Sequence, residues 1–353
     1  MTKLPVIQAH GSPYEMGRSI GLAVGEKVIK VSAHIEELKA LEAKWSGSEY
    51  VDILKAAARK AYPNYVREIE GMADGAGVPF ERLFIWNCRG DLRLPEDLPP
   101  AARNAAADGC TTLMLPGDFK LGTPNVIAHN EDGNENLHGH CFWLSAKPAE
   151  GLDFESYLYP GMTAGHTLGF NAAGLVQTIN NVRVHDLQPG IPRHIISRAI
   201  LDCHTLDEAV DILSRPDRAS GFHHILGRAG DPRLISVEAP ASGCDITEIK
   251  KPSAHANHLI REQFSSLPQT VTDSSTRRQR QASSLLEDGA HLGEGPEAIL
   301  FERETPIYRA NDAGDDYSQT LSTGVFNLFQ DRVEYYIHAT PEDRSSLSGT
   351  VYN

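Results

Sequence analysis

The sequence predicts an α+β protein in which sheets pack against other sheets or against helices. Toward the N-terminus, apolar residues recur at three- and four-residue steps, which is the spacing of an amphipathic helix. From Cys110 onward the chain breaks into short β-rich runs separated by Gly, Pro, Asn or Asp, and further helical stretches interrupt these runs. This order of helices, strands, helices and strands is typical of a layered α+β fold.

The helices are recognised by their apolar spacing. The predicted helices are residues 13–44, 50–61, 62–77, 191–204, 206–213, 276–287 and 296–302. The third ends in Gly75-Ala76-Gly77, a glycine-rich C-terminal cap. The basic run Arg277-Arg278-Gln279-Arg280 is expected on a solvated helix face, because the protein as a whole is acidic.

The strands are short and bounded by turn residues. The predicted strands are residues 111–115, 125–129, 141–146, 155–159, 166–170, 175–180, 223–226, 234–238, 246–250, 254–258, 320–330 and 333–339. Residues 129–133 are expected to form a charged turn, because Asp-Gly is a turn signal. The apolar run 84–88 also resembles a strand. The Arg89 and Asp91 that follow it are candidates to line a pocket, although a local ion pair is the favoured expectation.

Composition excludes several classes of function. The chain has 353 residues, 41% hydrophobic and 23% charged, with a net charge of −14, which argues against nucleic acid and anionic membranes as partners. No run is apolar and long enough to span a bilayer, and the N-terminus lacks the pattern of a secretory signal. The five widely spaced cysteines fit free thiols in a reducing cytoplasm, so we expect a cytoplasmic protein. Neither His138-Gly139-His140 nor His223-His224 has a pattern that defines a ligand set, so no metal and no cofactor are expected.

The junction Asp108-Gly109-Cys110 lies between the helical N-terminal part of the sequence and the β-rich part that follows. Residues 93–108 are rich in Pro and Ala and predict an exposed connector, for which a plain domain linker is the simplest interpretation. A cysteine directly after it needs a base in order to react, since an ordinary thiol has a pKa of about 8.5. A histidine placed by the fold is one candidate, and the chain has 15 of them.

A cut between Gly109 and Cys110 would supply a second kind of base. The new α-amine would have a pKa of about 7.7–8.0, and it would be attached to the nucleophile's own residue. Gly109 suits such a cut, because a residue without a Cβ admits strained backbone angles and an approaching thiol.

Several short motifs extend this interpretation over most of the chain. In order, they are Gly11-Ser12-Pro13-Tyr14-Glu15-Met16-Gly17, Asp108-Gly109-Cys110-Thr111-Thr112, Asn130-Glu131-Asp132-Gly133, Gly169-Phe170-Asn171-Ala172-Ala173-Gly174-Leu175, Gly190-Ile191-Pro192-Arg193-His194 and His255-Ala256-Asn257-His258. In content, order and rough spacing the sequence resembles the acyl-coenzyme A:6-aminopenicillanic acid acyltransferase family of N-terminal nucleophile hydrolases.

The resemblance implies a four-layer αββα fold and a precursor that cleaves itself before a cysteine. Residues 1–109 would become one chain and residues 110–353 the other, intertwined in one domain. Cys110 would be the nucleophile, Asp132 would hold its amine, and Asn257 would help form the oxyanion hole. Asn180 or Asn181 would make a further contact with the substrate. The expected substrate is a small N-acyl amine, cleaved at a linear amide through a thioester, and homo-oligomer formation is left open.

One departure weakens the acyl-transfer interpretation. The penicillin-forming members carry an arginine shortly before a Phe-Asn pair, whereas the place that matches here, near Leu321 and before Phe326-Asn327, has none. Three alternatives therefore stand beside the amide hydrolase: an acyltransferase that passes the acyl group to an amine, an uncut Cys/His hydrolase, and a non-catalytic ligand-binding module.

Overall fold

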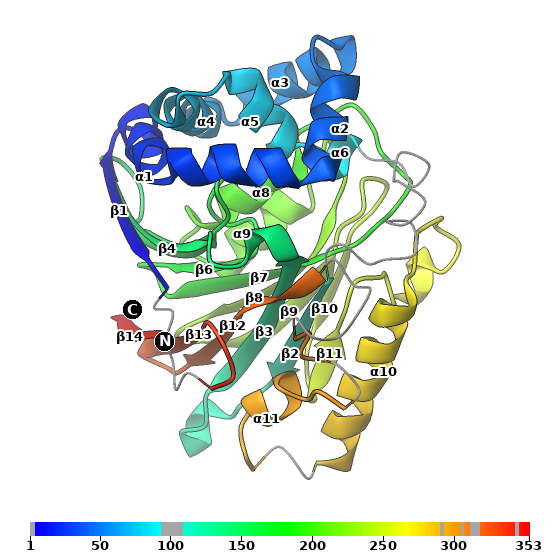
Figure 1. The fold of residues 1–353 in the computed structure, drawn as a ribbon. Coiled ribbons are helices and arrows are strands. Elements are labelled where there is room, and N and C mark those ends of the chain that lie inside the picture. The colour runs from blue at the N-terminus through cyan, green and yellow to red at the C-terminus, as the bar shows by residue number, and fades with distance from the viewer. Residues whose placement is uncertain (1–3, 93–108, 290–292, 305–306, 311–317, 343–345) are drawn as a thin grey trace.

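The computed structural model describes residues 4–92, 109–289, 293–304, 307–310, 318–342 and 346–353. These residues form a sheet of eight strands and a sheet of six, and helices cover the outer face of each sheet (Figure 1). The order of the layers is helix, sheet, sheet, helix, which confirms the predicted αββα fold. The connector predicted at 93–108 lies outside the described residues.

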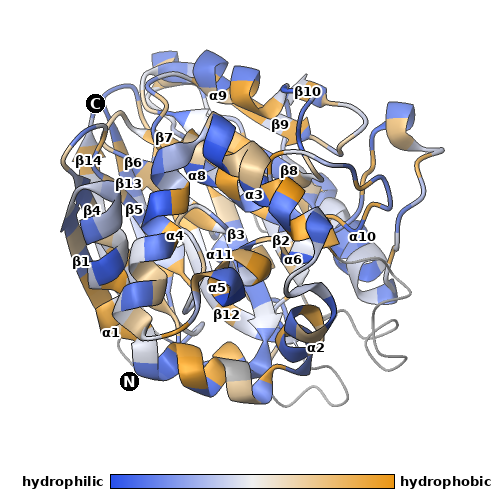
Figure 2. Cartoon of the chain, turned by 90° about the horizontal axis from the view of Figure 1, so that it is seen from above, coloured by the Kyte–Doolittle hydropathy of each residue, from blue (hydrophilic) through white to orange (hydrophobic). Residues whose placement is uncertain are grey.

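The larger helical layer covers the eight-stranded sheet. It consists of α1 (Pro13–His34), α2 (Glu36–Trp45), α3 (Glu49–Ala61), α4 (Pro63–Ala76), α5 (Phe80–Asn87), α6 (Arg89–Leu92), α8 (Arg193–Ile200) and α9 (Leu206–Leu213). Seen from above, hydrophilic and hydrophobic residues alternate along these helices, as expected for elements with one buried face (Figure 2). On the far side of the molecule, α10 (Asp273–Asp288) and α11 (Glu297–Leu300) cover the six-stranded sheet. None of the described helices is long and apolar enough to cross a membrane.

The two sheets differ in their connections. The eight-stranded sheet has the order β1 (Val6–Gly11), β4 (Phe142–Pro148), β5 (Phe154–Leu158), β6 (Leu168–Asn171), β7 (Leu175–Asn181), β8 (Phe222–Arg228), β9 (Asp231–Glu238) and β10 (Asp245–Glu248), and only β1 and β4 are paired in parallel. The six-stranded sheet has the order β11 (Ser253–His255), β2 (Gly109–Leu115), β3 (Asn125–Asn134), β12 (Ser318–Leu328), β13 (Arg332–His338) and β14 (Leu347–Tyr352), all antiparallel.

Aromatic side chains join the two sheets face to face. Phe170 of β6 lies 4.6 Å from Tyr335 of β13 and 6.2 Å from Phe326 of β12, measured between ring centroids. A separate apolar cluster joins the outer face of the six-stranded sheet to α10 and α11, and it includes Leu113, Ala128, Ala282 and Ile299. The sheets are thus buried on both faces, which holds their side chains in fixed positions.

Most predicted elements are present, but three expectations are wrong and two strands were missed. The predicted helix 13–44 is two helices, because Ile35 is extended, and Glu36 and Glu37 then favour a new helix start through the helix dipole. The apolar run 84–88 lies in α5 rather than in a strand, because a run buried on all sides has no period that separates helix from strand. The expected turn at 129–133 lies within β3, which pairs with both β2 and β12 there. Strands β1 and β14 were not predicted.

Helices α1 and α4 approach so closely that glycine is required at their contact. A Cβ on Gly21 would lie 2.1 Å from the carbonyl oxygen of Met72, and one on Gly71 would lie 2.1 Å from that of Tyr14. Both distances are far below van der Waals contact, and both involve backbone that cannot turn aside. The glycines therefore set the spacing of the helical layer over the sheet.

Gly21→Ala is expected to lower the midpoint of thermal unfolding. Overpacking of this contact should cost about 1–3 kcal/mol or more, which exceeds the gain of about 1 kcal/mol from alanine's helix propensity. Gly25→Ala on the same helix is the control, because its Cβ would lie 3.1 Å from the Cα of Ala76 and the neighbour must move only slightly. A Gly21→Ala protein as stable as the control would contradict this account of the contact.

Candidate active site

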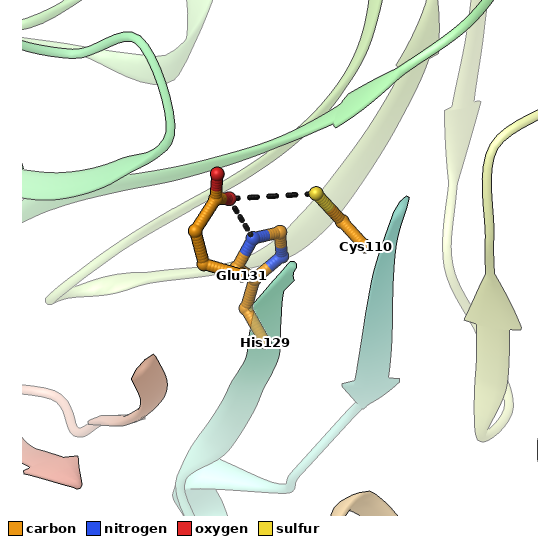
Figure 3. Close-up of side chains that lie close together, drawn as sticks. All are labelled: Cys110, His129 and Glu131. Atoms are coloured by element: carbon orange, nitrogen blue, oxygen red, sulfur yellow. Dashed lines mark hydrogen bonds and ion pairs between the residues drawn. The ribbon is translucent and has the colours of Figure 1, made fainter. Parts of the chain in front are cut away.

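The pairing of β2 with β3 places three functional groups together. Cys110 is the second residue of β2, is 4% exposed, and pairs with Glu131, while Gly109 pairs with Asp132. Figure 3 shows the Cys110 and Glu131 side chains pointing toward one another, with His129 beside them. Adjacent strands thus hold a thiol and two carboxylates in a buried site.

The backbone nitrogen of Cys110 has its own partner. It donates a hydrogen bond of 2.8 Å to Oδ1 of Asn257, which follows β11 and is 1% exposed. The side-chain nitrogen of Asn257 donates to the backbone oxygen of Asn181 at 3.0 Å. These two bonds orient the amide, with its oxygen toward Cys110 and its nitrogen toward the end of β7.

Arg278 of α10 connects these groups and was missed by sequence reasoning. Its Nη1 donates to the carbonyl oxygen of Cys110 at 2.5 Å and to Oγ1 of Thr111 at 3.0 Å, and its Nη2 donates to Oδ1 of Asn257 at 2.7 Å. Arg278 is 2% exposed, so the expectation of a solvated basic face is wrong for it, although Arg277 and Arg280 are exposed. A signal was available, because Ser275, Arg278, Ala282 and Leu286 share the helical spacing of a buried face.

Gly109 lies against two buried guanidinium groups. A Cβ at this position would be 2.7 Å from Nη2 of Arg278 and 3.1 Å from Nη1 of Arg309. Both arginines are at most 4% exposed, so neither could move aside into solvent. A side chain before Cys110 would therefore force a buried arginine to shift, and the two arginines place positive charge beside Gly109.

Asp132 is buried among charges of both signs. It is 1% exposed, and its Oδ1 accepts a hydrogen bond of 2.6 Å from the Thr320 hydroxyl. Burial raises the pKa of Asp132 to about 6, although the positive charges of Arg278 and Arg309 act in the opposite direction. Around neutral pH the carboxylate is therefore largely ionised and can hold a cation beside Cys110.

The sulfur of Cys110 faces a second carboxylate. Its thiol donates to Oε2 of Glu131 over 3.4 Å, and burial raises the pKa of the thiol well above its usual value. Glu131 also accepts hydrogen bonds from Thr167 Oγ1 at 2.5 Å and from the Tyr159 hydroxyl, and its Oε2 lies 3.1 Å from Nε2 of His129. Burial opposes ionisation of Glu131, but the interactions with His129, Thr167 and Tyr159 outweigh it and lower the pKa of the carboxyl.

Cys110, His129 and Glu131 are also the residues that could hold a metal ion. Among the residues that the structure describes, they form the one group of three such side chains whose ligand atoms all lie within 4.8 Å of one another. Each of these atoms already has a protein hydrogen-bond partner, since His129 Nδ1 lies 2.7 Å from Thr112 Oγ1. The three side chains thus belong to one connected network of hydrogen bonds.

A small cavity opens beside the thiol. It is lined by Arg89, Cys110, Glu131, Asp132, Tyr159, His166, Ile179, Asn181, Arg193, His194 and Phe222. Arg89 and Tyr159 also border a second, largely apolar cavity, whose walls include Val31, Ile35, Leu38, Trp86, Leu137, Pro160 and Met162. The ion pair expected between Arg89 and Asp91 is absent from the described residues, and Asp91 instead accepts hydrogen bonds from Ser220 and the backbone of Arg193.

The two neighbouring asparagines of β7 point their side chains to opposite faces of the strand. Successive side chains of a strand point to opposite faces, so Asn181 lines the cavity and Asn180 faces β2. Asn180 accepts a hydrogen bond of 2.7 Å from Thr112 and donates one of 2.9 Å to the carbonyl of His255. Neither side-chain polar atom of Asn181 has a hydrogen-bond partner within the described part of the chain, although both are buried. Of the two asparagines, Asn181 is therefore the one that lines the cavity at the thiol.

Replacing these asparagines in turn should change stability in different directions. Asn180→Ala leaves Thr112 and the carbonyl of His255 without their partner, and each such loss costs about 1–3 kcal/mol. Asn181→Ala removes buried polar atoms that have no partner, so stability should be unchanged or higher. Thermal unfolding of the two variants measures the difference. An Asn181→Ala protein destabilised as much as Asn180→Ala would show that Asn181 has a structural role.

Comparisons with known proteins identify the family of this chain and its relatives. The model of the family "acyl-coenzyme A:6-aminopenicillanic acid acyl-transferase" matches residues 121–342, a range that begins after Cys110. The β-alanyl-dopamine/carcinine hydrolase of Drosophila melanogaster is 26% identical over 375 aligned residues, which cover 94% of this chain and 92% of that protein.

Two further proteins are similar over less of the chain. The acyl-coenzyme A:6-aminopenicillanic-acid-acyltransferase 40 kDa form of Emericella nidulans is 24% identical over 72% of this chain and 69% of that protein. Among solved structures, a mutant conjugated bile acid hydrolase from Clostridium perfringens has a TM-score of 0.43 at 10% identity, over 68% of this chain and 92% of that one. Since the family model matches more than half of the sequence, the chain belongs to the acyl-coenzyme A:6-aminopenicillanic acid acyl-transferase family.

Proposed function

We propose that this protein cuts its own Gly109–Cys110 bond and then works as an N-terminal cysteine amidohydrolase. The single observation that carries the proposal is that the nitrogen and the sulfur of Cys110 have different partners in the site. Its nitrogen faces Asn257, its sulfur faces Glu131, and Asp132 lies across the strand pair from Gly109. A new amine at this nitrogen would therefore lie in a buried site already lined by its own sulfur, a carboxylate and an amide.

The residues around the bond support an intramolecular cut. Attack of the Cys110 sulfur on the Gly109 carbonyl would form a thioester, and water would then release residues 1–109 from residues 110–353. The negative oxygen of that step needs positive neighbours, and Gly109 lies against Arg278 and Arg309.

After the cut, each residue would take up a role in turnover. The α-amine, with an ordinary pKa of about 7.7–8.0, would accept the thiol proton, and Asp132 would hold the amine in place. The nitrogen of Asn257 carries two hydrogens, and only one is used on Asn181, so the other could be donated to the oxyanion of a substrate. Loss of one such donor typically costs about 10²–10³ in rate. Asn181, which lines the cavity at the thiol, would contact the substrate there.

The proposed substrate is a small N-acyl amine cleaved at its linear amide. The similarity to the Drosophila hydrolase, which covers nearly the whole chain, supports this class. The apolar cavity shares Arg89 and Tyr159 with the cavity beside the thiol, and it could take one apolar half of such a molecule. All five cysteines are free, which is consistent with our proposal of a cytoplasmic location.

Intact mass spectrometry tests the self-cleavage. The wild-type protein should give two pieces, residues 1–109 and 110–353, whereas Cys110→Ala should remain one chain of 353 residues. Cys141→Ala is the matched control, because Cys141 is equally buried and lies outside the cavity at Cys110, so that variant should still be cut. An uncut wild-type protein that hydrolyses amides would rule out the amine mechanism and favour a Cys/His hydrolase that uses His129.

Acyl transfer to an amine is a second candidate, favoured by the family to which the chain belongs. Water and an added amine would compete for the same Cys110 thioester. A screen of small N-acyl amines with the cut protein, with and without added amine acceptors, should yield mainly free acid and amine if hydrolysis dominates. A new amide whose yield rises with acceptor concentration would show that transfer is the principal reaction.

A further inference from the structure

The uncut chain lacks the base that the proposed mature enzyme would use. Before cleavage, the nitrogen of Cys110 belongs to a peptide bond and donates its hydrogen to Asn257, so it has no lone pair with which to accept a proton. The thiol is buried and protonated, so its attack on Gly109 requires another group to remove the proton. Whatever group does this acts only on the precursor.

Glu131 is the group in contact with that proton. Its Oε2 accepts the hydrogen bond from the Cys110 thiol, and Figure 3 shows the same oxygen facing His129. Two hydroxyl groups, those of Tyr159 and Thr167, hold the carboxylate in position. Asp132 acts on the sulfur in two opposing ways, because its charge raises the pKa of the thiol while a hydrogen bond from its backbone lowers that pKa.

The hydrogen bonds behind His129 determine where its protons lie. The nitrogen of the Asn180 amide donates to the carbonyl of His255, so the amide oxygen faces Thr112 and accepts the proton of that hydroxyl. The hydroxyl oxygen of Thr112 must then accept from Nδ1 of His129, which therefore carries a hydrogen.

One proton is consequently shared between His129 and Glu131. Nε2 of His129 lies 3.1 Å from Oε2 of Glu131, and an unprotonated nitrogen facing a carboxylate at that distance would be repelled. With the shared proton the pair is neutral overall. When the pair accepts one more proton it carries a single positive charge, which lies beside the thiolate that this transfer creates.

We propose that Glu131, supported by His129, is the processing base of the precursor, which takes the Cys110 thiol proton and returns it to the Cys110 nitrogen. This inference rests on the proposed self-cleavage. As the proton moves from sulfur to Glu131, the sulfur bonds to the Gly109 carbonyl carbon. The bond from that carbon to the Cys110 nitrogen then breaks, and the nitrogen takes the proton from Glu131. Water finally splits the thioester, giving its hydroxyl to Gly109 and its hydrogen to the sulfur.

Glu131→Gln tests the role, because glutamine keeps the size and an accepting oxygen but cannot take up the proton. In freshly translated chain followed by intact mass, cleavage should slow by about 10²-fold or more. Turnover per cut chain should fall by less than about tenfold, because the α-amine has by then become the base. Glu135→Gln, at an exposed position on the same segment, should be cut at the wild-type rate.

Hydroxylamine separates the two chemical steps. It attacks thioesters, so it would restore cleavage if only the final hydrolysis were impaired. For Glu131→Gln it should not raise the rate of cleavage, because formation of the thioester is itself the slowed step. Wild-type cleavage of the variant, rescue by hydroxylamine, or an equal loss of cleavage and of turnover per cut chain would each overturn the inference while leaving self-cleavage intact. A wild-type chain that stays whole would instead overturn the proposed function.

The pH profile of wild-type cleavage provides a test that needs no variant. Titratable groups from four parts of the chain interact with Glu131: His129 and Asp132 on β3, Cys110 on β2, Tyr157 and Tyr159 at the end of β5, and Cys141 just before β4. Across the cavity are Arg89 and His166. With a resident base the rate should be nearly flat above neutral pH. If hydroxide must generate the thiolate, the rate should rise about tenfold per pH unit, and that result would contradict the inference.

Discussion

The in-register pairing of β2 with β3 is the constraint on which the rest of the site depends. It sets Gly109 opposite Asp132 and Cys110 opposite Glu131, so a single sheet contact positions the bond, the sulfur and both carboxylates. A shift of one residue would turn every side chain of β2 to the other face. The register is held from both sides, because β12 pairs with β3 along its length and β11 pairs with the outer edge of β2.

Burial makes the charges of this site interdependent. Arg278 and Arg309 offset the cost of burying Asp132, and His129 does the same for Glu131. Arg278 also fixes the amide of Asn257 and donates to the carbonyl of Cys110, so a side chain of the outer helix α10 contacts the nucleophile's residue directly. In a site of this kind, removing one partner leaves the other charge buried in a medium of low dielectric. Replacing Arg278 would therefore change stability and function together.

The sequence predicted the layered fold and the helices and strands whose apolar residues recur at a clear period. Its motifs also assigned Cys110, Asp132 and Asn257 to one expected site. Arg278 was missed because its charge suggested solvent, although its spacing with Ala282 and Leu286 pointed inward. The choice between Asn180 and Asn181 required the face of β7, which depends on packing between sheets. The proton network of Glu131 arises from residues such as Tyr159 and Thr167 that are distant in sequence, and no local pattern encodes it.

The central claim is that Cys110 acts as the N-terminal nucleophile of a cut chain. Alkylation with iodoacetamide near neutral pH, followed by mass mapping and turnover assays, tests it most directly. We predict loss of turnover in proportion to the adduct on Cys110 of the piece 110–353, where the α-amine acts as the base. The buried Cys88, Cys141 and Cys203 should react far more slowly, and alkylation of the half-buried Cys244 should leave turnover unchanged. Full turnover after Cys110 is alkylated, or inactivation that follows a different cysteine, would contradict the account.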